Sequence, residues 1–164
     1  MFIAERSSEC LRDTRMPSRA ACSHGTPGLW SGDVKLLCIV ATGSWDYTVK
    51  VWNLRTEERE TTLEGHRGNV TSLCFSVTGM LASGSWDGTV RVWLPTVGSA
   101  IFVLEGHRAW VRTLAFSRDG LVLASAAEND MVRIWDMSTG KCIKRLQGHK
   151  DSALGCTFTP AELF

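Results

Sequence analysis

Histidine, serine and aspartate recur together in this sequence, and a hydrolase combines these three residue types to activate a serine nucleophile. In such a site the imidazole takes the proton of the hydroxyl while the carboxylate orients the imidazole. The recurrence argues against this chemistry, because an enzyme builds one catalytic set whereas structural sets repeat. The two sets are His66, Ser83 and Asp87, then His107 and Ser125 with Asn129 in the acidic position.

These residues sit in a repeated pattern that predicts β-hairpins. Residues 81–93 read Leu-Ala-Ser-Gly-Ser-Trp-Asp-Gly-Thr-Val-Arg-Val-Trp, which is two short apolar runs around a tight Trp-Asp-Gly turn. The same frame occurs at residues 41–52 and, more loosely, at residues 124–135. The tryptophans that close the frames, Trp52, Trp93 and Trp135, follow one another at 41 and 42 residues. An internal repeat of this period indicates a repeat architecture.

Each complete repeat contains four short strands, and helical periodicity is absent throughout. Gly-His pairs open the later repeats, at His66, His107 and His149. The expected organisation is a poorly ordered leader (1–33), a partial repeat (34–64), two complete repeats (65–105 and 106–147) and a truncated repeat (148–164). A strand is expected at 153–159 within the truncated repeat.

The leader does not share the repeat, and its arginines among serines, prolines and glycines favour low order. His24 nevertheless precedes Trp52 by 28 residues, as His107 precedes Trp135. It stands in Ser-His-Gly rather than Gly-His, so chance or a degraded repeat is favoured over a genuine first unit, and both alternatives stay open.

Composition and charge exclude several classes of protein. The 164 residues are 44% hydrophobic, which predicts a globular domain, and the net charge of +1 argues against a nucleic-acid partner on electrostatic grounds. No apolar stretch could span a membrane and no secretory signal is evident, so an intracellular protein, cytoplasmic or nuclear, is expected. The six cysteines form no Cys-x-x-Cys pair, and Cys10, Cys22 and His24 have the wrong spacing for a zinc finger. Neither a metal nor a cofactor is expected.

The combination of Gly-His, a turn aspartate and a closing tryptophan resembles the WD-repeat β-propeller family. Trp135-Asp136 carries the eponymous dipeptide, while Trp52-Asn53 and Trp93-Leu94 depart from it. The resemblance implies an all-β fold and a non-catalytic protein-protein interaction scaffold. Closed propellers have about 4 to 8 blades and this chain has about three, so a partial, unclosed propeller is expected. Either the chain is a fragment, or further blades come from a longer chain or a second chain.

The resemblance also assigns a structural role to the repeated sets. Trp93 would donate to Ser83, Ser83 to His66 and His66 to Asp87, leaving no open face for a substrate. Because Asn129 is uncharged, it would hold His107 more weakly, which makes the third repeat less rigid. The corresponding residues are Trp135 in that repeat and Thr42, Asp46 and Trp52 in the first.

A partner-binding face is implied on one rim. Large aromatic residues at turns are favoured at interface hot spots, although Trp45 and Trp86 could instead pack on neighbouring turns. A catalytic propeller and a substrate receptor of a larger ubiquitin-ligase-type assembly are the alternative functions. The face would comprise Trp45, Trp86 and Glu128 before the turn position, and Asn69, Thr71, Trp110, Arg112, Ser152 and Leu154 around the first strands.

Overall fold

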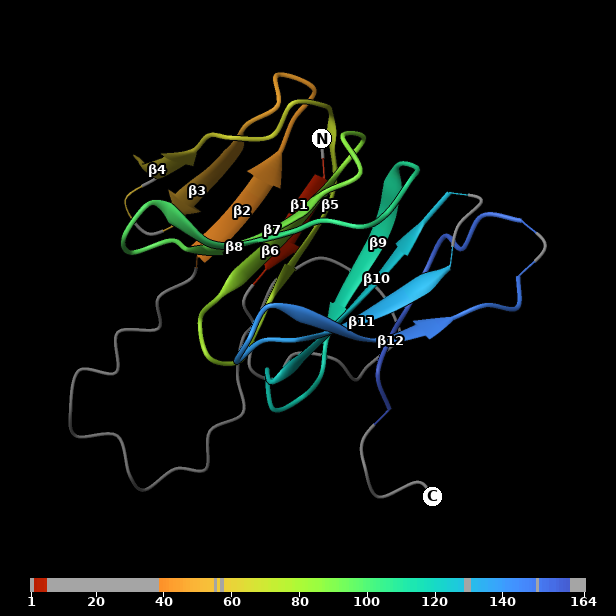
Figure 1. Cartoon of the computed structure of the whole chain (residues 1–164). Helices are drawn as coiled ribbons and strands as arrows, with labels where there is room; N and C mark the ends of the chain where they lie inside the picture. Colours follow the sequence, from red (N-terminus) through yellow and green to blue (C-terminus); the bar gives the residue numbers. More distant parts are fainter. Residues whose placement is uncertain are drawn as a thin grey trace, which may run out of the picture.

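The protein is built from three four-stranded antiparallel sheets that follow one another along the chain. The computed structural model describes residues 2–5, 39–54, 56, 58–128, 131–149 and 151–159. Figure 1 shows the second sheet between the first and the third, and the described residues form no closed ring. The expected all-β, unclosed architecture is confirmed. Within the described part of the chain, no helix is long and apolar enough to cross a membrane.

Each sheet is a meander in which consecutive strands pair. The first contains β1 (Phe2–Glu5), β2 (Ile39–Gly43), β3 (Val49–Asn53) and β4 (Glu58–Leu63). The second contains β5 (Val70–Phe75), β6 (Leu81–Ser85), β7 (Val90–Leu94) and β8 (Ser99–Leu104). The third contains β9 (Val111–Phe116), β10 (Val122–Ala127), β11 (Val132–Asp136) and β12 (Lys141–Leu146).

The hydrophobic core lies between the sheets rather than within one of them. Val49 and Val51 of the first sheet pack with Trp93 of the second, and a second cluster joins the second and third sheets. The middle sheet is therefore covered on both faces, and all five residues of β6 are buried. In contrast, β12 is largely exposed, because it lies at the outer edge of the third sheet.

Two glycines allow the sheets to approach closely. A Cβ atom on Gly43 would lie 2.5 Å from Val70 Cγ1, and one on Gly84 would lie 2.6 Å from Val111 Cγ1. The third sheet carries Ala126 at the equivalent position, where no fourth sheet follows in the described chain. Glycine therefore occupies the position against which the next sheet packs.

Two regions differ from the sequence-based expectations. Residues 2–5 form β1, which pairs with β2 and contacts β5, whereas the sequence predicts a poorly ordered leader there. The remaining leader, with Cys10, Cys22 and His24, lies outside the described residues. The strand expected at 153–159 is wrong: this stretch has no strand, and it lies along the third sheet, with Cys156 Sγ 3.8 Å from Thr113 Oγ1. An extended segment without a strand partner gains no ladder of hydrogen bonds.

Candidate functional site

The second sheet contains a continuous series of side-chain hydrogen bonds beneath its turns. Trp93 Nε1 donates to Ser83 Oγ at 2.8 Å, and Ser83 Oγ lies 2.7 Å from His66 Nε2. His66 Nδ1 lies 3.0 Å from Asp87 Oδ2, so the nitrogen facing the carboxylate carries the proton and Nε2 accepts from the serine. Ser83 has 0% exposure, so its hydroxyl is closed to a substrate.

Asp87 ties this chain to the surrounding backbone. Its Oδ2 also accepts from the Arg67 amide at 2.8 Å, and its Oδ1 accepts from the amide and hydroxyl of Thr89 at 2.8 and 2.7 Å. Burial by itself would raise the pKa of Asp87, but the hydrogen bonds from His66, Arg67 and Thr89 outweigh it and hold the pKa well below its ordinary value. The ionised carboxylate therefore fixes the β6–β7 turn to the loop before β5.

The third sheet repeats part of the arrangement. His107 Nε2 lies 2.7 Å from Ser125 Oγ, and Trp135 Nε1 donates to the same oxygen at 2.7 Å. Asn129, the residue expected at the acidic position, lies outside the described residues, so its effect on the rigidity of the third repeat stays a prediction.

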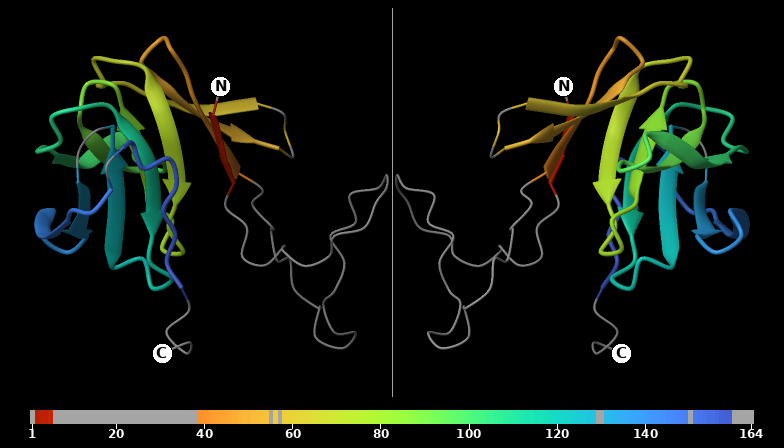
Figure 2. Two further views of the ribbon diagram at one scale, coloured as in Figure 1. Left: turned by 90° about the vertical axis from the view of Figure 1, so that its right-hand side faces the viewer. Right: turned by 90° about the vertical axis from the view of Figure 1, so that its left-hand side faces the viewer.

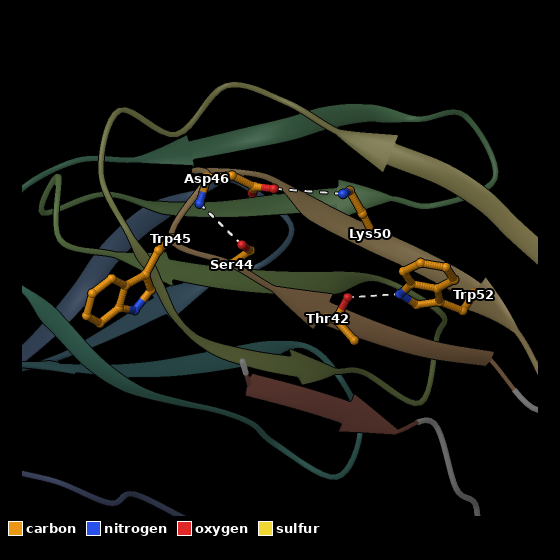
Figure 3. A pocket seen from close by; sticks show the side chains of 6 residues that line it. All are labelled: Thr42, Ser44, Trp45, Asp46, Lys50 and Trp52. Atoms are coloured by element: carbon orange, nitrogen blue, oxygen red, sulfur yellow. Dashed lines mark hydrogen bonds and ion pairs between the residues drawn. The ribbon is translucent and has the colours of Figure 1, made fainter.

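The first sheet has the tryptophan and the carboxylate of the set but no described histidine. Trp52 Nε1 donates to Thr42 Oγ1 at 2.9 Å, and Asp46 Oδ1 accepts from the amide and hydroxyl of Thr48 at 3.0 and 2.7 Å. These hydrogen bonds lower the pKa of Asp46. Where His66 would correspond, the structure has a hollow of about 460 Å³ (Figure 3). The residues around it are Thr42, Ser44, Trp45, Asp46, Lys50 and Trp52.

The described residues hold no cluster of three or more histidine, cysteine, aspartate or glutamate side chains that could bind a metal. Ser125, like Ser83, has 0% exposure. The sets that contain Ser83 and Ser125 therefore brace the turns, and neither serine is accessible as a nucleophile.

On the rim, three tryptophans from different sheets form one continuous row, hereafter the aromatic row. Trp86 stacks on Trp110 with ring centroids 4.1 Å apart and planes 9° apart, and Trp45 lies 5.9 Å from Trp86 at 45°. Trp45 is 68% exposed and Trp110 is 42% exposed, while Trp86 is half-buried between them. Because the turns of neighbouring sheets converge here, the rings pack on each other, which is one of the two alternatives raised from the sequence. Trp45 and Trp110 also face solvent, and a partner-binding role for them stays a prediction.

Charged side chains extend the aromatic row at one end. The Arg112 guanidinium lies 5.4 Å from the Trp110 ring centroid, and its Nη2 lies 2.7 Å from Glu128 Oε2. The Glu128 amide donates to the Trp110 carbonyl at 2.8 Å, and the Trp86 amide donates to the Asn69 carbonyl at 2.9 Å. These backbone bonds hold the turns beside the loops that precede β9 and β5.

Thr71 does not belong to this surface, and its expected position there is wrong. Its side chain is 7% exposed, and its hydroxyl contacts the carbonyl oxygens of Gly84 and Val111. The register of β5 against β6 shifts between Val70 and Ser72, so an irregularity at Thr71 turns the side chain between the sheets. Of the other expected positions, Leu154 is 78% exposed and Ser152 is partly exposed, and neither joins the row.

Sequence reasoning missed the hollow on the first sheet and the part played in it by Lys50. Lys50 Nζ lies 3.8 Å from Asp46 Oδ2, on the side of the carboxylate that faces the hollow (Figure 3). The signal available in the sequence was Ser23-His24, which stands at the correct distance before Trp52 but lacks the glycine of the later Gly-His pairs.

Comparison with known proteins matches three stretches of the chain to the family described as WD domain, G-beta repeat. The matched residues are 21–53, 57–93 and 98–136. The second stretch contains β4 followed by β5, β6 and β7, and the third contains β8 followed by β9, β10 and β11. Each of these two repeats therefore joins the last strand of one sheet to the first three strands of the next, which links the sheets covalently.

Curated relatives cover most of this chain. It is 33% identical over 150 residues to nuclear distribution protein PAC1 of Coccidioides posadasii (strain C735), covering 84% of this chain and 32% of that protein. It is 39% identical over 122 residues to small ribosomal subunit protein RACK1y of Oryza sativa subsp. japonica, covering 72% and 36% respectively. The chain thus spans about a third of the length of these relatives.

Proposed function

The chain belongs to the WD-repeat family, and from that premise we propose that it is a protein-protein interaction scaffold whose docking surface is the aromatic row. Proteins with this repeat typically act as interaction scaffolds, and we infer the same role for this chain from its repeats. The partner is a protein or peptide segment, and the proposed role needs no cofactor.

The stacked and exposed tryptophans are the observation that carries the proposal. Trp45 and Trp110 keep 68% and 42% of their surface in solvent, although burying so large a side chain is favourable. The stack with Trp86 restrains the rings before a partner arrives, so less side-chain entropy is lost on binding. Tryptophan and arginine are the residue types that carry most of the energy in protein interfaces.

The surroundings of the row define the chemistry of the partner. Apolar or planar side chains would pack on the indole faces, while Arg112 and Glu128 form a polar border at one end. The net charge of +1 lacks the broad basic surface that holds nucleic acid through its phosphates. A peptide with apolar or aromatic anchors is therefore the proposed ligand class.

Quantitative co-purification of the full chain from cells tests the proposal. Trp45→Ala and Trp110→Ala should each deplete the same partners, because each removes part of one continuous surface. Val97→Ala and Leu121→Ala are matched controls, since these residues are 68% and 59% exposed on turns at the opposite ends of the strands. An identical partner set for the row variants and the controls, at equal thermal stability, would contradict the proposed docking surface.

No described contact favours either alternative function, a catalytic propeller or a substrate receptor of a ubiquitin-ligase-type assembly. The location that we propose is intracellular, cytoplasmic or nuclear, which suits the free thiols of Cys74, Cys142 and Cys156. Imaging of the tagged chain checks this location, and secretion of the chain would contradict it.

A further inference from the structure

The residues that line the hollow on the first sheet include the equivalents of those that contact His66 in the second sheet. Thr42, Asp46 and Trp52 stand where Ser83, Asp87 and Trp93 stand, because the two hairpins share one sequence frame. In the second sheet the imidazole fills the space between hydroxyl and carboxylate. In the first sheet Trp52 is only partly buried, and the described residues supply no imidazole.

Two hydrogen-bonding positions in this hollow lack an imidazole partner among the described residues. Asp46 Oδ1 is taken by Thr48, as Asp87 Oδ1 is taken by Thr89. Asp87 Oδ2 binds both an imidazole and an amide, whereas no described imidazole or amide binds Asp46 Oδ2, which lies 3.8 Å from Lys50 Nζ. The Ser44 hydroxyl also interacts with the Asp46 carboxylate. The Thr42 hydroxyl accepts from Trp52 and has no acceptor for its own proton among the described residues. These two positions match the two nitrogens of a neutral imidazole.

His149 is a histidine without a corresponding site. It follows Gly148, as His66 follows Gly65 and His107 follows Gly106, and it begins a repeat unit in the same way. It is exposed and makes no hydrogen bond to another described residue. It follows β12 of the third sheet, and the second sheet lies between the third sheet and the first (Figure 1).

The two outer edges carry complementary charge. On β4 and directly after it, Glu58, Glu60 and Glu64 are exposed and outnumber Arg59. Exposed cations on β12 are Lys141, Lys144 and Arg145. The three sheets lie side by side in the order of the chain (Figure 2). If the third sheet of one copy packed on the first sheet of another in the same manner, these opposite charges would attract each other.

We propose that the hollow of the first sheet is a histidine-binding site and that its occupant is His149 of a second copy of this chain. The imidazole would donate to Asp46 Oδ2 and accept from Thr42 Oγ1, and the third sheet of one copy would pack on the first sheet of the next. This contact is head-to-tail, so it leads to a closed ring or to a filament. Two copies supply twice three sheets, which lies within the range of about 4 to 8 blades found in closed propellers.

Sedimentation velocity of the full chain over a range of concentrations tests the proposal. The mass should rise above the 18.1 kDa of one chain as concentration increases. Asp46→Asn and His149→Ala should each weaken self-association by about tenfold or more, because each removes a hydrogen bond to an ionised carboxylate. Asp119→Asn, at another exposed turn, and Asp151→Ala, two residues after His149, are the matched controls and should associate as the wild type does.

A mixing experiment adds a readout that misfolding cannot mimic. The Asp46→Asn variant keeps an intact His149 and the His149→Ala variant keeps an intact hollow. At a concentration at which neither variant self-associates, their equimolar mixture should therefore form one-to-one dimers. A wild type that stays monomeric, or an association that neither substitution weakens, would overturn the proposal. So would a monomer that His24→Ala destabilises to the same extent as Asp46→Asn, since the occupant would then come from the same chain.

Discussion

Trp93 Nε1 donates to Ser83 Oγ at 2.8 Å, across the hairpin that joins β6 to β7. The first sheet has the same contact at 2.9 Å between Trp52 and Thr42. The surroundings differ, because Trp93 is 1% exposed under the first sheet whereas Trp52 stands at the open hollow (Figure 3). Equivalent hydrogen bonds are thus buried in the second sheet and open to solvent in the first.

Replacing the two tryptophans by phenylalanine measures what that environment contributes. Trp93→Phe should lower the free energy of unfolding by about 1 to 3 kcal/mol, because Ser83 and the indole pocket lose a buried partner. Trp52→Phe should cost about 1 kcal/mol or less, since water can replace the lost donor. Urea denaturation of both variants checks the difference, and equal losses would show that burial is not the cause.

Acid should reveal the contribution of Asp87. Its pKa is lowered in the folded state, so the unfolded chain takes up this proton at higher pH than the folded chain does. The stabilisation is therefore complete above the ordinary value of 3.8 and is lost as pH falls below it toward the folded-state pKa. Denaturation at a series of pH values should show the stability gap between wild type and Asp87→Asn closing in acid. A gap that widens in acid would mean that the sign is wrong.

Tyr47 and Gly88 occupy the same position of two equivalent turns with the same left-handed backbone. Their φ angles are 71° and 77°, a region that costs a residue with a side chain about 1 to 2 kcal/mol. Tyr47→Gly should therefore raise the free energy of unfolding by up to about 1 kcal/mol, after the extra backbone entropy of glycine is subtracted. Gly88→Ala should lower it, and its Cβ would also lie 3.1 Å from the His107 carbonyl. Thermal melts of both variants test this, and changes of the same sign would contradict the strain argument.

The contact between the second and third sheets depends on Gly84. A methyl group there would lie 2.6 Å from both Val111 Cγ1 and Ser72 Oγ, so Gly84→Ala should destabilise the fold by about 1 to 3 kcal/mol. Gly155→Ala is the control, because its Cβ would meet no atom within 4 Å. If calorimetry gave both variants the melting temperature of the wild type, the sheets would have room to separate at this point.

The sequence alone determined the strands and their repetition. Alternation of apolar residues and the Trp-Asp-Gly turn at Asp87 act over a few neighbours, so they predicted β6, β7 and the equivalent hairpins correctly. The spacing of Trp52, Trp93 and Trp135 gave the number of sheets in the same way, since each repeat carries one hairpin frame.

Only the tertiary structure decided how these elements meet. The pairing of β1 with β2 joins residues more than thirty positions apart, and no local pattern in Phe2–Glu5 predicts it. The inward turn of Thr71 depends on the register between β5 and β6, and the stacking of Trp86 on Trp110 depends on where the second and third sheets converge. Side-chain direction and contacts between sheets follow from packing in three dimensions, and a periodic sequence fixes only which residues are available for it.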